Sequence, residues 1–299
     1  MRVRLGVSWP AALAFAVVTR DKLRRLCRVL TGMLLAPLVW LLVLAVFTPL
    51  PSELRRGGPS DSIRFLDRDG GLLREVRADD GTRARWVPLE EVGDRVILAV
   101  LAAEDRRFRM HPGVDPVACV RAVLSSLWHR RIVSGASTLT MQLARLVRPH
   151  PRNFRGKVGE MALALRIEAS LSKREILEQY VNLAPFGEGI RGIGASSAAY
   201  LDKPPAKLSW AEAASLVGLA RGPAVYSLRR HPERVLRRRD RILRRLQAAH
   251  WITEDEATRA LSEPLSVRIG TAAFGAPHLV HALYTGALGD PPARDKPRS

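Results

Sequence analysis

The feature that most constrains the fold of this chain is a predominantly apolar run from Leu30 to Leu50, LTGMLLAPLVWLLVLAVFTPL. About twenty apolar residues are enough for a helix to cross a bilayer. Five basic residues between Arg20 and Arg28 precede the run, and basic flanks tend to stay on the cytoplasmic side. The run predicts a single uncleaved transmembrane anchor with everything after Pro51 outside the cytoplasm, and a buried core helix is the alternative. A shorter apolar stretch, Leu5–Thr19, is interrupted by polar residues and proline, and it fits a partial span or an interfacial helix.

The charge balance of the chain predicts an acidic partner. Its 299 residues carry a formal net charge of +19, which suits nucleic acid, anionic lipid or a phosphorylated substrate. Aromatic residues make up only 6% of the chain, too few for a surface that stacks single-stranded bases. No disulfide is expected between Cys27 and Cys119, and no run of residues has metal-ligand spacing. The arginine-rich segment Arg229–Arg245 is interpreted as a solvated helix face, with a lipid or nucleic-acid site as the alternative.

After the apolar run, the pattern is first extended and then helical. Pro49–Asp61 is rich in proline, glycine and serine and predicts a linker. Ser62–Leu89 looks extended, with a turn signal at Asp69-Gly70. Leu72–Val76 and Trp86–Val87 are expected to pair as a β-hairpin. Few strand signals follow residue 92.

Helix-start signals mark the rest of the chain. Asp94 and Asp115 are each placed to cap a helix, and Asp115 is followed by a proline suited to the first turn. Capping boxes are expected at Ser172, Ser209 and Thr253. The predicted fold is therefore mostly α, with a short N-terminal β-hairpin and one transmembrane helix. The expected divisions are a cytoplasmic segment over 1–29, the anchor over 30–50, linker and hairpin over 51–91, the main helical domain over 92–268, and a tail over 269–299.

Glu104 is the first candidate for chemistry. It lies on the same helical face as Ile97, Val100 and Leu101. A carboxylate on an apolar face either pairs with a cation or lines a cleft, where it can act as a general base. An ordinary ion pair with the neighbouring Arg106 or Arg107 is the simpler alternative.

Glu160 repeats this arrangement. Ala164 and Ile167 follow it on one helical face, and Lys157 precedes it by one turn. Two carboxylates in different environments can divide the roles of base and electrostatic support. A structural pair between Glu160 and Lys157 is the alternative.

The segment Gly135–Arg145 supplies groups that bind anions. Ser137 and Thr138 can cap a helix and donate to an oxyanion, while Gln142 and Arg145 follow one and two turns later. A helix N-terminus with hydroxyls and an arginine forms a ready anion site. The alternative, equally consistent with this segment, is an ordinary helix cap followed by polar residues on the surface.

Two further patterns are set aside. His111 has no serine or cysteine nucleophile beside it and is interpreted as a residue that stabilises a turn. Ser170–Lys173 matches the S-x-x-K pattern of penicillin-reactive enzymes, but the companion S-D-N and K-T-G patterns are absent from the chain. No acylation by penicillin is expected.

Taken in order, these motifs resemble glycosyltransferase family 51, the peptidoglycan polymerases. Glu104–Gly113 matches the family's E-D-x-x-F-x-x-H-x-G in full, and Gly135–Gln142 matches G-x-S-T-x-T-x-Q in full. The third motif, R-K-x-x-E, departs from the pattern. Gly156 stands in place of its arginine, and Arg155 is one position away.

The resemblance continues through Lys173–Asn182 and Gly194–Glu212 and covers about residues 62 to 268. It implies a lysozyme-like helical domain in two lobes with a long cleft. Asp202 stands where a glycine before Lys203 is common, which puts the shape of that loop in question.

The resemblance also implies a reaction. Glu104 would deprotonate the acceptor sugar 4-hydroxyl, which attacks C1 of the donor with inversion and expels undecaprenyl diphosphate. Glu160 would help organise the diphosphate and its divalent cation, Mg²⁺ or Mn²⁺, which the substrate itself mainly holds. The implied substrate-binding residues are Asp105, Ser137, Thr138, Gln142, Arg145, Arg155, Lys157, Arg191 and Lys203. The implied partners are lipid II, the growing glycan, the membrane and a wall-synthesis complex, without nucleic acid.

Two other functions fit parts of the sequence. A lysozyme-like hydrolase or lytic transglycosylase would also use a glutamate in a helical domain. A membrane-tethered basic scaffold that recruits anionic partners through Arg229–Arg245 would need no catalytic glutamate. The apolar run and the S-T-x-T-x-Q segment favour synthesis over both.

Overall fold

The computed structural model describes residues 10–55, 61–69, 71–129, 137–220, 222, 230–265, 277–285 and 287. Gly135 and most of the predicted tail lie outside these residues. The described chain is mostly helical, as predicted. The α-helices are α1 (Pro10–Phe47), α2 (Ser52–Arg55), α3 (Leu89–Val92), α4 (Asp94–Glu104), α5 (Pro116–His129), α6 (Leu139–Val147), α7 (Phe154–Ser170), α8 (Lys173–Leu183), α9 (Ile193–Leu201), α10 (Trp210–Ala220), α11 (Pro232–Ala248), α12 (Glu254–Ser262) and α13 (Pro277–Tyr284). Two 3₁₀ turns, η1 (Phe108–Met110) and η2 (Pro205–Lys207), lie between them.

Most of the predicted helix starts are confirmed. The three expected capping boxes form, with reciprocal bonds between Ser172 and Glu175, Ser209 and Glu212, and Thr253 and Glu256. The start of α4 differs, because Gly93 is the cap and Asp94 is already the first helical residue. Gly93 has a φ of +84°, and a Cβ there would lie 2.8 Å from the Ala206 Cα atom. The chain turns too tightly at this point for any residue with a side chain.

The strands form two small sheets. β1 (Ile63–Leu66) pairs antiparallel with β2 (Leu72–Val76), while β3 (Arg83–Ala84) pairs parallel with β5 (Ile190–Arg191), which in turn pairs antiparallel with β4 (Pro185–Gly187). The predicted hairpin exists, but Trp86–Val87 is not one of its strands. The Asn182 side chain instead accepts from the Val87 N–H at 2.9 Å and donates to the Val87 carbonyl at 2.9 Å. A side-chain amide on α8 therefore replaces the strand partner.

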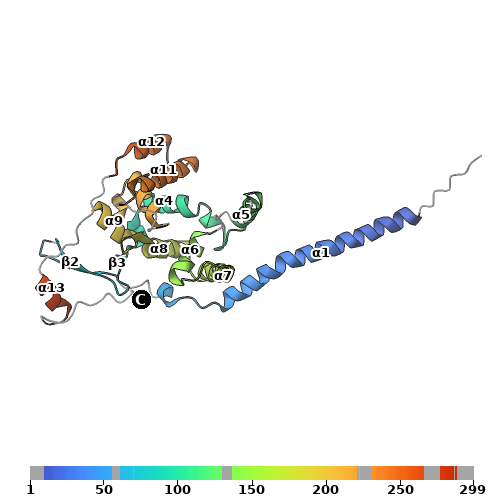
Figure 1. Ribbon diagram of the computed structural model, residues 1–299, viewed down its shortest axis with the longest axis horizontal. Helices are drawn as coiled ribbons and strands as arrows, with labels where there is room; N and C mark the ends of the chain where they lie inside the picture. Colours follow the sequence, from blue (N-terminus) through green and yellow to red (C-terminus); the bar gives the residue numbers. More distant parts are fainter. Residues whose placement is uncertain are drawn as a thin grey trace, which may run out of the picture.

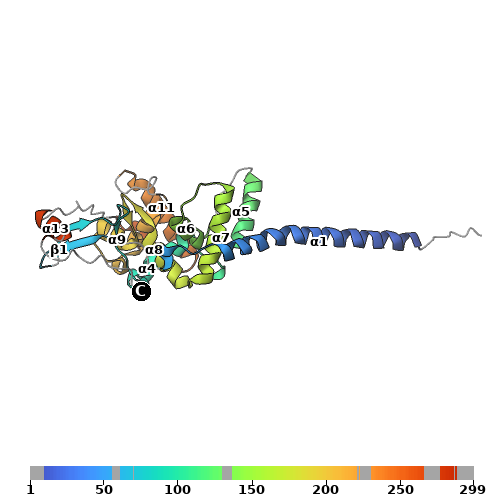
Figure 2. The same ribbon diagram turned by 90° about the horizontal axis from the view of Figure 1, so that it is seen from below.

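α1 is one continuous helix that contains the described part of the shorter apolar stretch and most of Leu30–Leu50, and it projects from the body of the molecule (Figures 1 and 2). The part of the shorter stretch before Pro10 lies outside the described residues. Near its C-terminal end, Leu41 and Ala45 pack against Ala162 of α7. Many of its larger apolar side chains are exposed, Met33 and Phe47 among them. The described residues contain no helix that is both long enough and apolar enough to cross a membrane.

The core is built around two central helices. α10 packs against α4, α11 and α12, and α6 packs against α7 and α8 (Figure 1). In α6 the side chains of Leu139, Met141 and Leu143 are completely buried. Because close-packed interiors resist displacement, α6 offers a rigid base for any polar side chain on its remaining face.

We expect Asn182→Ala to lower the free energy of unfolding by about 2–4 kcal/mol, since it leaves the buried N–H and carbonyl of Val87 without their hydrogen-bond partner. Chemical denaturation of the full chain in detergent micelles measures this value. The control is Asp69→Ala in the exposed hairpin turn, expected within about 0.5 kcal/mol of wild type. Equal stability of Asn182→Ala and wild type would show that the hydrogen bonds between Asn182 and Val87 do not stabilise the fold.

Candidate active site

The first two sequence motifs are bound together at the N-terminus of α6. Asp105 accepts a hydrogen bond from the Leu139 N–H at 2.9 Å and lies 3.1 Å from His111 Nε2. Thr138 caps α6 and donates to the Gly113 carbonyl at 2.5 Å. His111 thus stabilises a turn, as predicted. Asp105 and Thr138 fix the loop that follows Glu104 to the start of α6.

Glu104 ends α4 and lies in a buried hydrogen-bond network. Gln142 donates to one of its carboxylate oxygens at 2.9 Å, and Arg238 of α11 donates to the other at 3.1 Å. The hydroxyl of Tyr180 donates to the Gln142 amide oxygen at 3.2 Å and sets the orientation of that amide. Only 4% of the Glu104 side chain is exposed. A carboxylate has about four lone-pair sites, so the two described bonds leave capacity to accept a proton.

Glu160 lies beneath a cluster of basic side chains. Arg145 donates to Oε2 from both Nε (3.0 Å) and Nη2 (2.5 Å), and His150 Nε2 lies 3.1 Å from the same oxygen. Lys157 donates to Oε1 at 2.6 Å and to the Ser137 hydroxyl at 2.6 Å. The carboxylate is completely buried, whereas more than a third of the Arg145 side chain is exposed.

One face of α6 connects the two glutamates. Gln142 and Arg145 are three residues apart, so their side chains lie next to each other on the helix. Gln142 contacts Glu104 and Arg145 contacts Glu160. The two carboxylates, 56 positions apart in the sequence, therefore belong to a single site.

The charge of this site is uneven. The basic side chains of Arg145 and Lys157 outnumber the single carboxylate of Glu160, and both are partly exposed. Because Glu160 holds them in place, they present a pre-set positive surface to solvent. Such an arrangement suits an anion that bears negative charge on several oxygens.

The remaining predicted binding residues make no described contact with Glu104 or Glu160. Arg155 is exposed on α7 and takes part in none of the described contacts around Glu160. Arg191 contacts Asp80 at 3.2 Å and the Thr82 hydroxyl at 3.2 Å. Lys203 pairs with Glu212 at 2.6 Å. Their role in substrate binding stays a prediction.

Asp202 answers the question about the loop before Lys203. It adopts φ 53° and ψ 40°, the left-handed conformation that a glycine would take easily. Aspartate tolerates this region better than most residues. The loop turns back onto α9, where Ser197 donates to the Lys203 carbonyl.

The structure adds residues that the sequence analysis missed. The interpretation of Arg229–Arg245 as a solvated face is wrong for its inner half, because Arg238 and Arg239 are buried. Arg238 lies three residues after Val235 and four before Ile242, so its position on the apolar face was visible in the sequence. Tyr180 and His150 are the other additions. Tyr180 lies in the family-like segment Lys173–Asn182, from which no single residue was chosen for the site, and His150 lies in the segment before α7.

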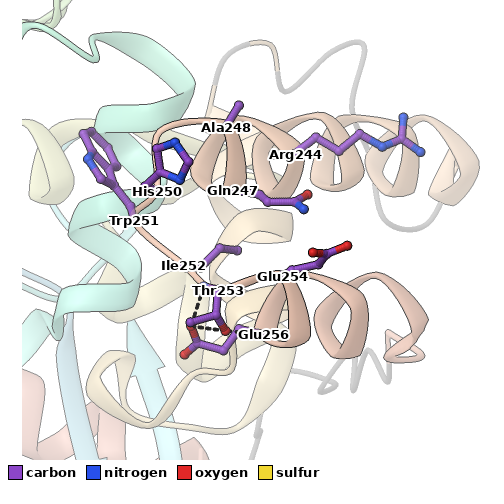
Figure 3. Close-up of a pocket in the computed structure, with 9 residues that line it drawn as sticks. All are labelled: Arg244, Gln247, Ala248, His250, Trp251, Ile252, Thr253, Glu254 and Glu256. Atoms are coloured by element: carbon purple, nitrogen blue, oxygen red, sulfur yellow. Dashed lines mark hydrogen bonds between the residues drawn. The ribbon is translucent and has the colours of Figure 1, made fainter.

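Two hollows beside α11 in the described part of the chain are not lined by Glu104, Glu160 or their hydrogen-bond partners. A hollow of about 600 Å³ lies between α11 and α12 (Figure 3). It is lined by Arg244, Gln247, Ala248, His250, Trp251, Ile252, Thr253, Glu254 and Glu256. None of these residues contacts Glu104 or Glu160 in the described structure.

Comparison with known proteins agrees with the geometry. The family model described as transglycosylase matches residues 69–247. The chain belongs to the transglycosylase family. The match takes in α4, α6 and α7, and with them both glutamates and every basic side chain that contacts them.

The relatives of this transglycosylase-family chain are penicillin-binding proteins. It is 42% identical to penicillin-binding protein 1C of Escherichia coli over 66% of this chain and 26% of that protein. It is 36% identical to penicillin-binding protein 1A of Aquifex aeolicus over 77% of this chain and 32% of that protein. The chain thus spans about a quarter to a third of the length of these curated relatives. A crystal structure of penicillin-binding protein 1A from Haemophilus influenzae matches 78% of this chain and 25% of that one, with 21% identity and a TM-score of 0.44.

We expect Arg238→Met to lower the free energy of unfolding by about 3–5 kcal/mol, because it leaves the Glu104 carboxylate buried without its cation. The control, Arg241→Met, removes an exposed arginine from the same helix and is expected to change stability by less than about 0.5 kcal/mol. Denaturation curves of both variants test this. Similar denaturation curves for Arg238→Met and Arg241→Met would mean that the buried pair of Arg238 and Glu104 is not formed.

Asp115 should make stability depend on pH. Burial acts to raise its pKa, but the Arg107 guanidinium and the Ala118 N–H, which both donate to it, together outweigh burial and hold the pKa below its ordinary value. A group with a lowered folded pKa contributes stability above its unfolded pKa and loses it as pH falls through the folded value.

We therefore expect Asp115→Asn to destabilise the protein by about 1–2 kcal/mol at pH 7, with a difference that shrinks below about pH 4. Denaturation of wild type and variant at pH 7 and pH 3 measures the effect. A difference that stays constant across this range would contradict it.

Proposed function

We propose that the chain is a peptidoglycan glycosyltransferase that polymerises lipid II and releases undecaprenyl diphosphate. The observation that carries this proposal is the single site in which α6 joins two buried glutamates, one hydrogen-bonded beside Arg238 and one beneath a basic cluster. Membership of the transglycosylase family supports it. The lysozyme-like, two-lobed arrangement and the domain divisions expected from the sequence are part of the same proposal.

Glu104 is the proposed general base. It would accept the proton of the acceptor sugar 4-hydroxyl while that oxygen attacks C1 of the donor sugar. The bond from C1 to the diphosphate then breaks, and the lipid diphosphate leaves with the bonding electron pair. The bonds from Gln142 and Arg238 hold the carboxylate in one orientation, so it need not reorganise during the transfer.

The basic cluster is the proposed site of the departing diphosphate. Negative charge builds up on the leaving group as the C1–O bond breaks, and fixed cations stabilise that charge. Arg145 and Lys157 supply them, and each retains an exposed part that an anion can reach. Ser137 and Thr138 lie at the same end of α6. Hydrolysis of a glycan has no anionic leaving group, so a hydrolase would gain little from this cluster.

Glu160 is not arranged as a metal ligand, because its oxygens accept hydrogen bonds from Arg145, Lys157 and His150. A divalent ion at this carboxylate would compete with these basic groups at close range. The proposed Mg²⁺ or Mn²⁺ therefore accompanies the diphosphate of the substrate. The protein contributes the cations around it.

The proposed location is the cytoplasmic membrane, with α1 as a single-pass anchor and the catalytic domain on the outer side. The apolar run and the basic residues that precede it support this assignment. Further exposed apolar side chains occur on the body of the molecule at Met110, Leu124, Trp128 and Phe154. A surface of this kind suits contact with lipid, where a lipid-linked substrate resides.

Polymerisation of lipid II by the full chain in detergent with a divalent cation tests the proposal. We expect glycan strands from wild type, and a loss of about 10²–10⁴-fold in rate for Glu104→Gln, which keeps the side-chain shape and removes the base. Arg241→Met is the matched control, expected to retain activity. Both variants are first checked for a cooperative unfolding transition.

Preformed glycan is the second substrate. Shortening of that glycan, with no growth from lipid II, would identify a hydrolase or lytic enzyme. Full polymerisation by Glu104→Gln would show that Glu104 is not the base. Neither growth from lipid II nor shortening of glycan by wild type would leave a scaffold as the better account.

A further inference from the structure

His150 is a basic group at Glu160 that no motif identified. Its Nε2 atom lies 3.1 Å from the buried Glu160 Oε2 atom, and its Nδ1 atom lies 3.0 Å from the carbonyl of Pro151. Both neighbours are hydrogen-bond acceptors, and the tautomer of the ring decides which of them receives a proton. The ring is mostly buried, with 16% of the side chain exposed.

Gly156 provides the space for this ring. A Cβ atom at Gly156 would lie 2.5 Å from His150 Nδ1 and closer still to the Pro151 carbonyl oxygen. Both distances are too short for any residue with a side chain. Gly159, one turn further along the same helix, is different, because a Cβ atom added there would have no other atom within 4 Å. The requirement for glycine at 156 is therefore local and comes from the His150 segment.

The segment that carries His150 is stiff. Prolines at 149 and 151 flank the histidine, which fixes their own φ angles and restricts the residue before each of them. Asn153 then caps α7 by accepting from the Gly156 N–H at 2.8 Å. A ring held between two prolines loses little further freedom when it binds Glu160.

We propose that His150 is a positioning residue for the diphosphate site and that Gly156 is the residue that admits it. His150 and Arg145 share Oε2 of Glu160, while Lys157 holds Oε1. Exposed Arg155 takes no part in these described contacts. Among the described residues, the histidine in the segment before α7, and not Arg155, therefore supplies this further contact to Glu160. This inference rests on the proposed function, since it assigns the cluster to a diphosphate.

The test measures binding of inorganic diphosphate to the full chain by calorimetry, alongside the KM and kcat for lipid II. Loss of one charge-assisted hydrogen bond should weaken diphosphate binding about tenfold in His150→Ala. The KM for lipid II should rise by a similar factor, with kcat less affected. The matched control is His231→Ala, which removes a histidine that also precedes a proline and lies outside the site. His150→Gln, which keeps a donor near the Nε2 position, should recover most of the affinity.

Substitutions at Gly156 and Gly159 test the proposal that Gly156 provides the space for His150. Gly156→Ala should weaken diphosphate binding as much as His150→Ala does, while Gly159→Ala should bind as wild type. If Gly156→Ala acts by displacing His150, the double variant His150→Ala/Gly156→Ala should bind no more weakly than either single variant. Additive losses would show that the glycine does not act through the histidine.

The outcomes separate this inference from the proposed function. Wild-type affinity in a folded His150→Ala variant would overturn the inference while leaving polymerisation intact. Diphosphate binding that depends on His150, in a chain that does not polymerise lipid II, would support the inference and reject the function. If His150→Ala does not fold, the comparison of His150→Gln with Gly156→Ala decides, and equal wild-type affinity in both would overturn the inference.

Discussion

The site depends on the fixed position of α6. This short helix is buried along most of its surface, and Asp105 and Thr138 bind its N-terminus to the loop after Glu104. Its polar face carries Gln142 and Arg145, each in contact with a different glutamate. A shift of α6 would therefore disturb both carboxylates at once. The two ends of the proposed reaction, proton removal and departure of the diphosphate, are coupled through one rigid element.

The second constraint is the cost of burying charge. An ionised carboxylate without partners is costly in a protein interior, by several kcal/mol even after relaxation. Glu104 and Glu160 meet this cost differently. Glu104 has one buried arginine and one neutral amide, which leaves room to accept a proton. Glu160 is surrounded by basic groups, so its charge is used to hold cations in place. The division of roles follows from the partners and not from the glutamates themselves.

Local features of this structure could be predicted from the sequence, and long-range ones could not. Capping residues at Ser172 and Thr253, and the apolar face that carries Glu104, depend on neighbours within a few positions. The bond from Asn182 to Val87, and the pair of Arg238 with Glu104, join segments 95 and 134 positions apart. Arginine at a buried helix position can be recognised, but its partner cannot be found without the fold. Leu72–Val76 is a strand as predicted, but its predicted pairing with Trp86–Val87 was wrong. Strand pairing is not decided by neighbouring residues.

The position of α1 links the proposed membrane anchor to the chemistry. Leu41 and Ala45 of α1 pack on Ala162, two residues after Glu160 on α7. Residues two apart on a helix point in nearly opposite directions, so α7 presents one face to α1 and the other to the basic cluster. The cluster is then held at a fixed height relative to the end of the anchor. For the proposed substrate, whose diphosphate joins a lipid tail to a sugar, that height would decide whether the phosphates reach Arg145 and Lys157. In the proposed function α7 would thus act as the spacer between the bilayer and the reaction.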